Sequence, residues 1–123
     1  MKKEYTQLEV WMESRKLVNI VYDKTKTFPR EELFGLTNQI RRSAVSIPSN
    51  IAEGCGRRTS KDTLQFLYIS RGSLFELETQ LYLSLDQQYI SEIVFEELSK
   101  QILVCKKLIN GFINYYKNLK NEN

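Results

Sequence analysis

The sequence predicts an all-α protein, and three observations support this fold class. Apolar residues recur at steps of three and four along four long segments, turn or capping residues bound each segment, and the 123 residues include only two prolines and five glycines. Four long helices with short connections pack most economically as a single antiparallel up-down-up-down four-helix bundle. Residues 1–123 are expected to form one domain, because a chain of this length buries one ordinary core.

The first helix has a start signal at Thr6, because Glu9 follows three residues later and completes a capping box. The segment is expected to end at Phe28, since the residue before Pro29 is pushed out of helical geometry. Its apolar stripe comprises Val10, Leu17, Val21 and Phe28, broadened by Trp11 and Val18.

The second helix is expected to begin at Pro29 and to end at Gly54 and Gly56. Its apolar stripe passes through Pro48, where a lost hydrogen bond and a steric clash cost about 3 kcal/mol. A break at Ile47 and one kinked helix are the two interpretations, and the unbroken phase favours a kink at Pro48. Nearby serines can satisfy the freed carbonyls: Ser43, Ser46 and Ser49. The stripe consists of Leu33, Leu36, Ile40, Ala44, Ile47, Ile51 and Cys55.

The third helix is capped by Thr59 or Ser60 and carries two apolar rows. One interpretation of the wide apolar arc is a generously buried helix, and the other is a row that packs on another subunit. Gly72 and Ser73 would permit close helix approach. The first row is Leu64, Leu67, Leu74, Leu77, Leu81 and Leu85, and the second is Tyr68, Phe75, Tyr82 and Tyr89.

The fourth helix opens at Ser91, with glutamates in its first turns that complement the helix dipole. Its stripe comprises Val94, Leu98, Ile102, Cys105, Ile109, Phe112, Tyr116 and Leu119.

The residue inventory offers little to catalysis or metal binding. The absence of histidine removes the commonest general base and metal ligand. Cys55 and Cys105 are expected to be buried free thiols in a reducing cytoplasm. Glu76 and Glu78 point in different directions on a helix, and Glu53 is expected to pair with a neighbouring arginine. We therefore expect no enzyme activity, no metal, no cofactor and no small-molecule substrate. The sequence also lacks a signal peptide and an apolar run that could span a membrane, which indicates a cytoplasmic protein.

Basic residues give the sequence its candidate binding site. The net charge is +3, with Arg41 and Arg42 before the proline and a second group, Arg57, Arg58 and Lys61, around the junction of two helices. Such side chains and the N–H groups of a helix start can hold phosphates. The alternative is an ordinary solvated face with a few ion pairs.

Three passages resemble a known bacterial family of four-helix-bundle proteins, the 23S rRNA intervening-sequence proteins. They are LEVWMESRKLVNIVYDKT, FPREELFGLTNQIRRSAVSIPSNIAEGCGR and FLYISRGSLFELETQLYLS. The resemblance implies a four-helix bundle and assembly into a ring, expected to be a pentamer. A relative is the accessory protein to the reverse transcriptase of diversity-generating retroelements, where a basic surface binds nucleic acid. Basic positions of the family pattern match Arg41, Arg42, Arg57, Arg58 and Arg71.

The protein is therefore expected to be a non-enzymatic homo-oligomer that binds nucleic acid through arginines of the second and third helices. The first expectation for the nucleic acid is structured RNA, and DNA is the other. Arg71 lies between core leucines, so an intersubunit or intrahelical ion pair is an equal alternative for it. The alternative function is an oligomeric scaffold for a protein partner, with no direct role in nucleic-acid binding. For either function, the expected subunit interface is formed by Tyr68, Phe75 and Tyr82.

Overall fold

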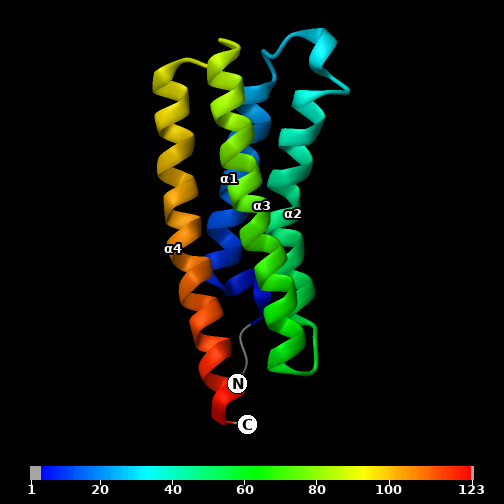
Figure 1. Cartoon of the computed structure of the whole chain (residues 1–123), viewed down its shortest axis with the longest axis vertical. Helices are drawn as coiled ribbons and strands as arrows, with labels where there is room; N and C mark the ends of the chain where they lie inside the picture. Colours follow the sequence, from blue (N-terminus) through cyan, green and yellow to red (C-terminus); the bar gives the residue numbers. More distant parts are fainter. Residues whose placement is uncertain (1–3, 123) are drawn as a thin grey trace.

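The computed structural model describes residues 4–122, and within them the chain is all-α, as predicted. Four long helices make up the bundle: α1 (Glu9–Thr25), α2 (Leu36–Cys55), α3 (Ser60–Asp86) and α4 (Glu92–Glu122). Two short 3₁₀ helices precede α1 and α2, namely η1 (Tyr5–Gln7) and η2 (Arg30–Glu32). Figure 1 shows the four long helices side by side along one axis.

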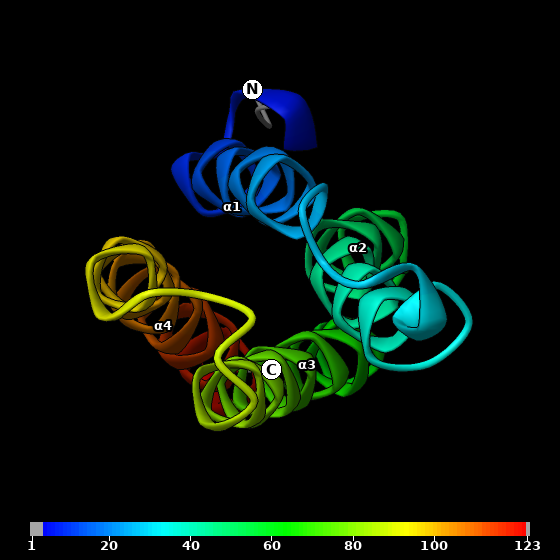
Figure 2. The same ribbon diagram turned by 90° about the horizontal axis from the view of Figure 1, so that it is seen from above.

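The connections place successive helices in opposite directions. Figure 1 shows the α1–α2 and α3–α4 connections at one end of the bundle, and the α2–α3 turn at the other end together with both chain termini. Seen from above, the helices follow one another around a ring, so that each packs on its two neighbours (Figure 2). The most extensive contact is between α2 and α3. We call the end that carries the α2–α3 turn the turn end.

The predicted stripes form the core. Each helix contributes large apolar side chains that are almost fully buried, as the 3.6-residue period requires. The buried set includes Leu17 and Val21 of α1, Ile40, Ile47 and Ile51 of α2, Leu67, Leu74, Leu77 and Leu81 of α3, and Leu98, Ile102, Ile109 and Ile113 of α4.

Two predicted helix starts were wrong. Thr6 lies inside η1, whose capping box joins Glu4 and Gln7, and α1 begins only at Glu9 after an extended Leu8. Pro29 precedes η2 instead of a long helix, because the chain turns again at Gly35 before α2 begins.

Glu32 fixes the position at which α2 begins. Its carboxylate accepts the Leu36 N–H at 3.1 Å and the Tyr89 hydroxyl at 2.8 Å, which raises the pKa of Tyr89. The extra turn also moves Leu33 out of the predicted stripe, and its side chain is 49% exposed.

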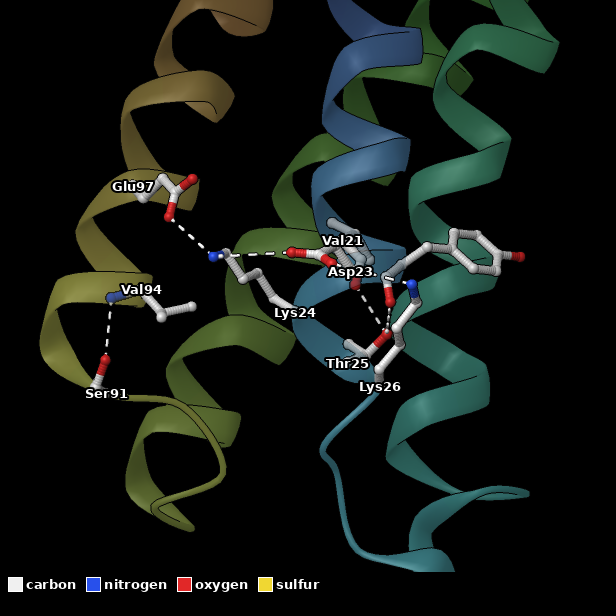
Figure 3. A network of polar contacts seen from close by, with 9 residues as sticks. Val21, Asp23, Lys24, Thr25, Lys26, Ser91, Val94 and Glu97 are labelled. Carbon is white, nitrogen blue, oxygen red and sulfur yellow. Dashed lines mark hydrogen bonds and ion pairs between the residues drawn. The ribbon is translucent and has the colours of Figure 1, made fainter.

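Other predicted starts are confirmed. The Thr59 hydroxyl caps α3 by accepting the Asp62 N–H at 3.1 Å, and the Ser91 hydroxyl accepts the Val94 N–H at 3.2 Å at the start of α4 (Figure 3). Helix α2 runs without a break from Leu36 to Cys55 with Pro48 inside it, so the interpretation of a break at Ile47 is wrong. The kink at Pro48 stays a prediction.

Small polar residues join α2 to α3. The hydroxyls of Ser43 and Ser46, expected to bond their own helix, instead meet Glu76 at 2.6 Å and Ser73 at 2.9 Å. Two further bonds bury hydroxyls of α3 against carbonyls of α2, from Ser70 to Ile47 and from Thr63 to Gly54, each at 2.8 Å. These four contacts align the two helices along their length.

The glycine that permits close helix approach is Gly54, not Gly72. A Cβ at Gly54 would lie 3.2 Å from both Phe66 Cβ and the Thr63 carbonyl oxygen. A Cβ at Gly72 would meet nothing within 4 Å, so the predicted close approach at Gly72 does not occur between the described helices.

Candidate nucleic-acid interface

The α2–α3 turn brings three of the predicted basic residues together. Helix α2 ends at Gly56, whose N–H bonds back to the carbonyls of Ala52 and Glu53, and α3 starts four residues later. Arg57, Arg58 and Lys61 therefore lie within one tight turn, beside the free N–H groups that begin a helix.

Arg57 is already partnered within this turn. Its guanidinium donates to Glu53 at 2.9 Å and lies over the Phe66 ring, 4.5 Å from the centroid. The predicted pairing of Glu53 with a neighbouring arginine is thus confirmed. Arg58 and Lys61 are exposed, and neither has a hydrogen bond or ion pair to any described residue. These two side chains carry the uncompensated positive charge of the turn.

The charge of the bundle is unevenly distributed along its axis. No lysine or arginine occurs between Arg71 and Lys100. Acidic residues of that stretch lie toward the end opposite the turn: Asp86, Glu92, Glu96 and Glu97. These four carboxylates repel an approaching polyanion from the α3–α4 side of that end, whereas Lys26 and Arg30 of the α1–α2 connection lie at its other side. The basic turn end attracts the polyanion.

Arg41 and Arg42 lie elsewhere on α2. Sixteen residues separate Arg41 from Arg57, which corresponds to about 24 Å along a helix. The Arg41 Nε donates to the Thr25 hydroxyl at 2.9 Å, and its guanidinium lies over the Tyr22 ring at 4.7 Å, so Arg41 fastens α2 to α1. Arg42 is exposed.

Arg71 belongs to a third location, on the side of α3 that faces α4. Its guanidinium donates to the Asn110 side chain at 3.1 Å and lies over Tyr68 at 5.2 Å. Among residues 4–122 it has no ion pair, so the expected intrahelical ion pair is absent from the described chain. The six predicted nucleic-acid-binding residues thus form three separate groups instead of one patch.

The aromatic row on α3 is at the surface. Tyr68, Phe75 and Tyr82 are 38%, 52% and 53% exposed, so the interpretation of a generously buried helix is wrong for these three. Each ring touches one neighbour: Arg71 lies over Tyr68, Lys106 lies over Phe75, and Phe95 packs on Tyr82. The fourth member, Tyr89, is half-buried.

Two exposed aliphatic residues extend this row, and the sequence analysis missed them. Ile69 and Leu83 directly follow Tyr68 and Tyr82, and both are about half exposed. Gly72 lies among them on the same outer surface of α3, where its Cα is open to solvent. The signal was available, because an apolar residue directly after two members of the aromatic row widens the arc beyond what one core needs. We call Tyr68, Ile69, Gly72, Phe75, Tyr82 and Leu83 the α3 outer face.

The two glutamates of α3 that the sequence singled out contact different helices. Glu76 accepts the Ser43 hydroxyl of α2, whereas Glu78 forms an ion pair with Lys106 of α4 at 2.8 Å, so the two point in different directions as predicted. Cys105 is buried and Cys55 partly buried, with no disulfide between them. Burial raises the pKa of the Cys105 thiol to about 11. Within the described chain, no group of three or more potential ligands could hold a metal ion.

None of the described helices combines the length and hydropathy that a membrane-spanning helix requires.

Comparison with known proteins places this arrangement in a family. The model of the 23S rRNA-intervening sequence protein family matches residues 6–111, which contain most of all four helices. A search of curated proteins finds no match.

Among solved structures, a similar one is the 1.70 Å crystal structure of a protein of unknown function from the S23 ribosomal protein family of Bacteroides thetaiotaomicron VPI-5482. It superposes with a TM-score of 0.77 at 26% identity, over 85% of this chain and 95% of that one. The chain belongs to the 23S rRNA-intervening sequence protein family.

Proposed function

We propose that this protein is a non-enzymatic homo-oligomer that binds structured RNA through the basic residues at its turn end. The observation that supports this most is the pair Arg58 and Lys61, which are exposed and unpaired among the described residues at the start of α3. The family name connects its members with 23S rRNA, in agreement with an RNA ligand.

The net positive charge at the turn end of one subunit is small. Arg57 is neutralised by Glu53, and the exposed Asp62 lies next to Lys61, so one subunit offers about two phosphate contacts here. A ring of subunits would repeat these contacts on one assembly, and repeated weak contacts on one RNA multiply into a high avidity. The family resemblance points to a pentamer, and oligomerisation is therefore part of the proposed function.

The α3 outer face is the surface proposed for this assembly. Exposed apolar surface that is contiguous marks protein contacts in soluble proteins, whereas isolated apolar residues do not. Here Tyr68, Phe75 and Tyr82 continue along about four turns of one helix with Ile69 and Leu83 beside them.

The RNA contact is tested by removing charge at the turn. We expect Arg58→Gln with Lys61→Gln to weaken binding of a labelled RNA hairpin roughly tenfold or more at 150 mM salt, since each phosphate contact is lost in every subunit. The matched control is Lys16→Gln with Lys100→Gln, which removes the same charge from exposed positions of α1 and α4. Equal weakening by both variants would reduce the proposal to a non-specific charge effect, and no weakening by the turn variant would contradict it.

Assembly is tested separately by light scattering. The triple variant Tyr68→Ala, Phe75→Ala and Tyr82→Ala should lower the mass of the assembly, while Ile93→Ala, at the most exposed aliphatic position of α4, should leave it unchanged. Circular dichroism checks that the triple variant remains folded. An unchanged mass would exclude this row as the subunit interface.

A second function is favoured by the same α3 outer face. In this alternative the protein is an oligomeric scaffold, and the face binds a different protein. An assembly that forms normally but fails to bind RNA at low salt would support the scaffold over the RNA-binding proposal.

A further inference from the structure

A hollow beside the α1–α2 connection is lined by cations and hydroxyls. Its volume is about 370 Å³, and Lys26, Arg30 and Arg41 line it together with Thr25 and Thr37. It lies at the end of the bundle opposite the α2–α3 turn, so it is separate from the basic turn of the proposed function. None of the described side chains that line it is acidic.

The Thr37 hydroxyl is the feature that indicates a ligand. Thr37 is only 4% exposed, and its Oγ1 has no hydrogen-bond partner among the described residues. Buried hydroxyls are normally paired, because an unpaired one forfeits its bonds to water. Its Oγ1 has almost no solvent-accessible surface, so a ligand oxygen becomes the missing partner only when the Thr37 side chain turns toward the hollow that it lines.

Two contacts fix the Arg41 guanidinium beside the same hollow. The Thr25 hydroxyl donates to the Val21 carbonyl at 2.8 Å (Figure 3) and accepts the Arg41 Nε at 2.9 Å. The guanidinium also lies over the Tyr22 ring. Because both contacts fix the guanidinium plane, little side-chain entropy remains to be lost when an anion binds.

A second, larger hollow continues from the first. It has a volume of about 780 Å³, and Leu33, Thr37 and Arg41 line both hollows. Its other walls include Tyr22, Phe34 and Arg42. Phe34 is 91% exposed at the tip of the α1–α2 connection, where no described residue covers its ring. An exposed aromatic ring beside arginines is a surface on which a nucleobase stacks.

Two neighbouring carboxylates, Glu32 and Asp23, have partners of their own, and the exposed Glu31 next to Arg30 lines neither hollow. Glu32 accepts the Leu36 N–H and the Tyr89 hydroxyl, and it lines neither hollow. Asp23 lies 4.0 Å from Lys26, and Figure 3 shows Lys24 of the same helix reaching Glu97 of α4 at 3.4 Å. Lys26 is therefore partly compensated, and Arg30 and Arg41 carry most of the charge that faces an anion.

We propose that the two hollows together bind one nucleotide, with its phosphate among Arg30, Thr37 and Arg41 and its base against Phe34. Each hollow by itself falls within the roughly 300–1,000 Å³ of ligand sites, and the two adjoin at Leu33, Thr37 and Arg41. The nucleotide is either a free mononucleotide or the 5′-phosphorylated end of an RNA strand. The second source rests on the proposed function, whereas the first does not.

Calorimetric titration of the full chain with 5′-AMP tests the site. Adenosine lacks the phosphate and inorganic phosphate lacks the base, so each should bind at least tenfold more weakly than 5′-AMP. A trinucleotide with a 5′-phosphate, compared with the same trinucleotide bearing a 5′-hydroxyl, distinguishes a strand end from a free nucleotide. Tighter binding of the phosphorylated strand than of 5′-AMP assigns the site to a strand end, and the reverse order assigns it to a free nucleotide.

Three variants distinguish a loss of nucleotide binding from a loss of the fold. Thr37→Val keeps the shape of the side chain and should weaken 5′-AMP roughly tenfold, since it removes a hydrogen bond to a charged group. Arg30→Gln and Phe34→Ala change exposed residues that the core does not need, and each should weaken 5′-AMP about fivefold or more. Thr37→Val should also raise the melting temperature of the free protein, because a buried unpaired hydroxyl is removed.

The turn variant Arg58→Gln with Lys61→Gln is the control. It should bind 5′-AMP as the wild type does, whether or not it retains the RNA hairpin, so failure of the nucleotide site and failure of the proposed function are distinguishable. Absence of 5′-AMP binding would overturn the inference. Wild-type affinity in both Thr37→Val and Phe34→Ala would also overturn it.

Discussion

Replacement of Gly54 by valine should destabilise the bundle, whereas replacement of Gly72 by alanine should stabilise it. At Gly54 a Cβ would lie 3.2 Å from Phe66 Cβ and from the Thr63 carbonyl oxygen, closer than ordinary van der Waals contact. Helices α2 and α3 would have to separate locally, which would lengthen the 2.8 Å bond from the Thr63 hydroxyl to the Gly54 carbonyl.

The expected magnitude follows from these two effects. Overpacking of a close contact costs about 1–3 kcal/mol, and weakening one buried hydrogen bond costs about 1 kcal/mol. A gain of about 0.5 kcal/mol from the lower chain entropy of the unfolded valine variant offsets part of this. We therefore expect Gly54→Val to lower the free energy of unfolding by about 2–3 kcal/mol.

Gly72→Ala is the matched control. A Cβ there meets nothing within 4 Å in its own subunit, so within one subunit only the gain in helix propensity remains, about 0.5–1 kcal/mol. Urea unfolding followed by circular dichroism measures both variants, at one protein concentration, because assembly makes apparent stability depend on concentration. The midpoint for Gly54→Val should fall by about 1–2 M. A Gly54→Val stability within about 0.5 kcal/mol of wild type would refute the close packing of α2 on α3.

Three further predictions concern single side chains. Thr59→Ala removes the cap of α3 and should cost about 1 kcal/mol, seen as a lower melting temperature; an unchanged melting temperature would contradict the cap. Ser70→Ala leaves the buried Ile47 carbonyl without its hydroxyl donor and should cost about 1 kcal/mol in urea unfolding, with the exposed Ser49→Ala as a neutral control. The pKa of Cys105 is raised to about 11 from 9.0, so the unfolded chain ionises first as the pH rises. Stability is fully present below pH 9 and should decline by about 2–3 kcal/mol more in wild type than in Cys105→Ala as the pH approaches 11; parallel pH profiles would contradict this.

The sequence predicts the helices well where a long periodic stripe meets a side-chain cap. The predicted leucine row of α3 and most of the predicted stripe of α4 lie in the core or pack against it, and Thr59 and Ser91 start their helices. The phase of the stripe in α2 also predicted correctly that the helix passes through Pro48. In each case one short-range rule determines the outcome, so no tertiary information is needed.

Prediction fails where a distant residue determines the local structure. Pro29 is a good first residue of a helix, yet the start of α2 depends on Glu32, which is shared between the Leu36 N–H and Tyr89 of a remote connection. Similarly, Gly54 and Gly72 look alike in sequence, and only the position of α3 makes Gly54 a contact.

The candidate sites were predictable in composition but not in arrangement. The basic character of Arg57, Arg58 and Lys61 can be read from the sequence, and so can the aromatic row on α3. The pairing of Glu53 with a neighbouring arginine was predicted as well, because the two are four residues apart, whereas the fixing of Arg41 on α1 follows only from the packed helices. The orphan hydroxyl of Thr37 has no sequence signal, because burial without a partner is a property of the fold.

Binding of a structured RNA by the intact protein, measured from 50 to 300 mM salt, tests the central claim most directly. If the turn end holds the RNA, the logarithm of the association constant should fall linearly with the logarithm of salt concentration. The slope should become shallower by about two for each subunit that contacts the RNA when Arg58 and Lys61 are replaced by glutamine. No detectable binding by the intact assembly at 50 mM salt, or the same slope for both proteins, would contradict the account.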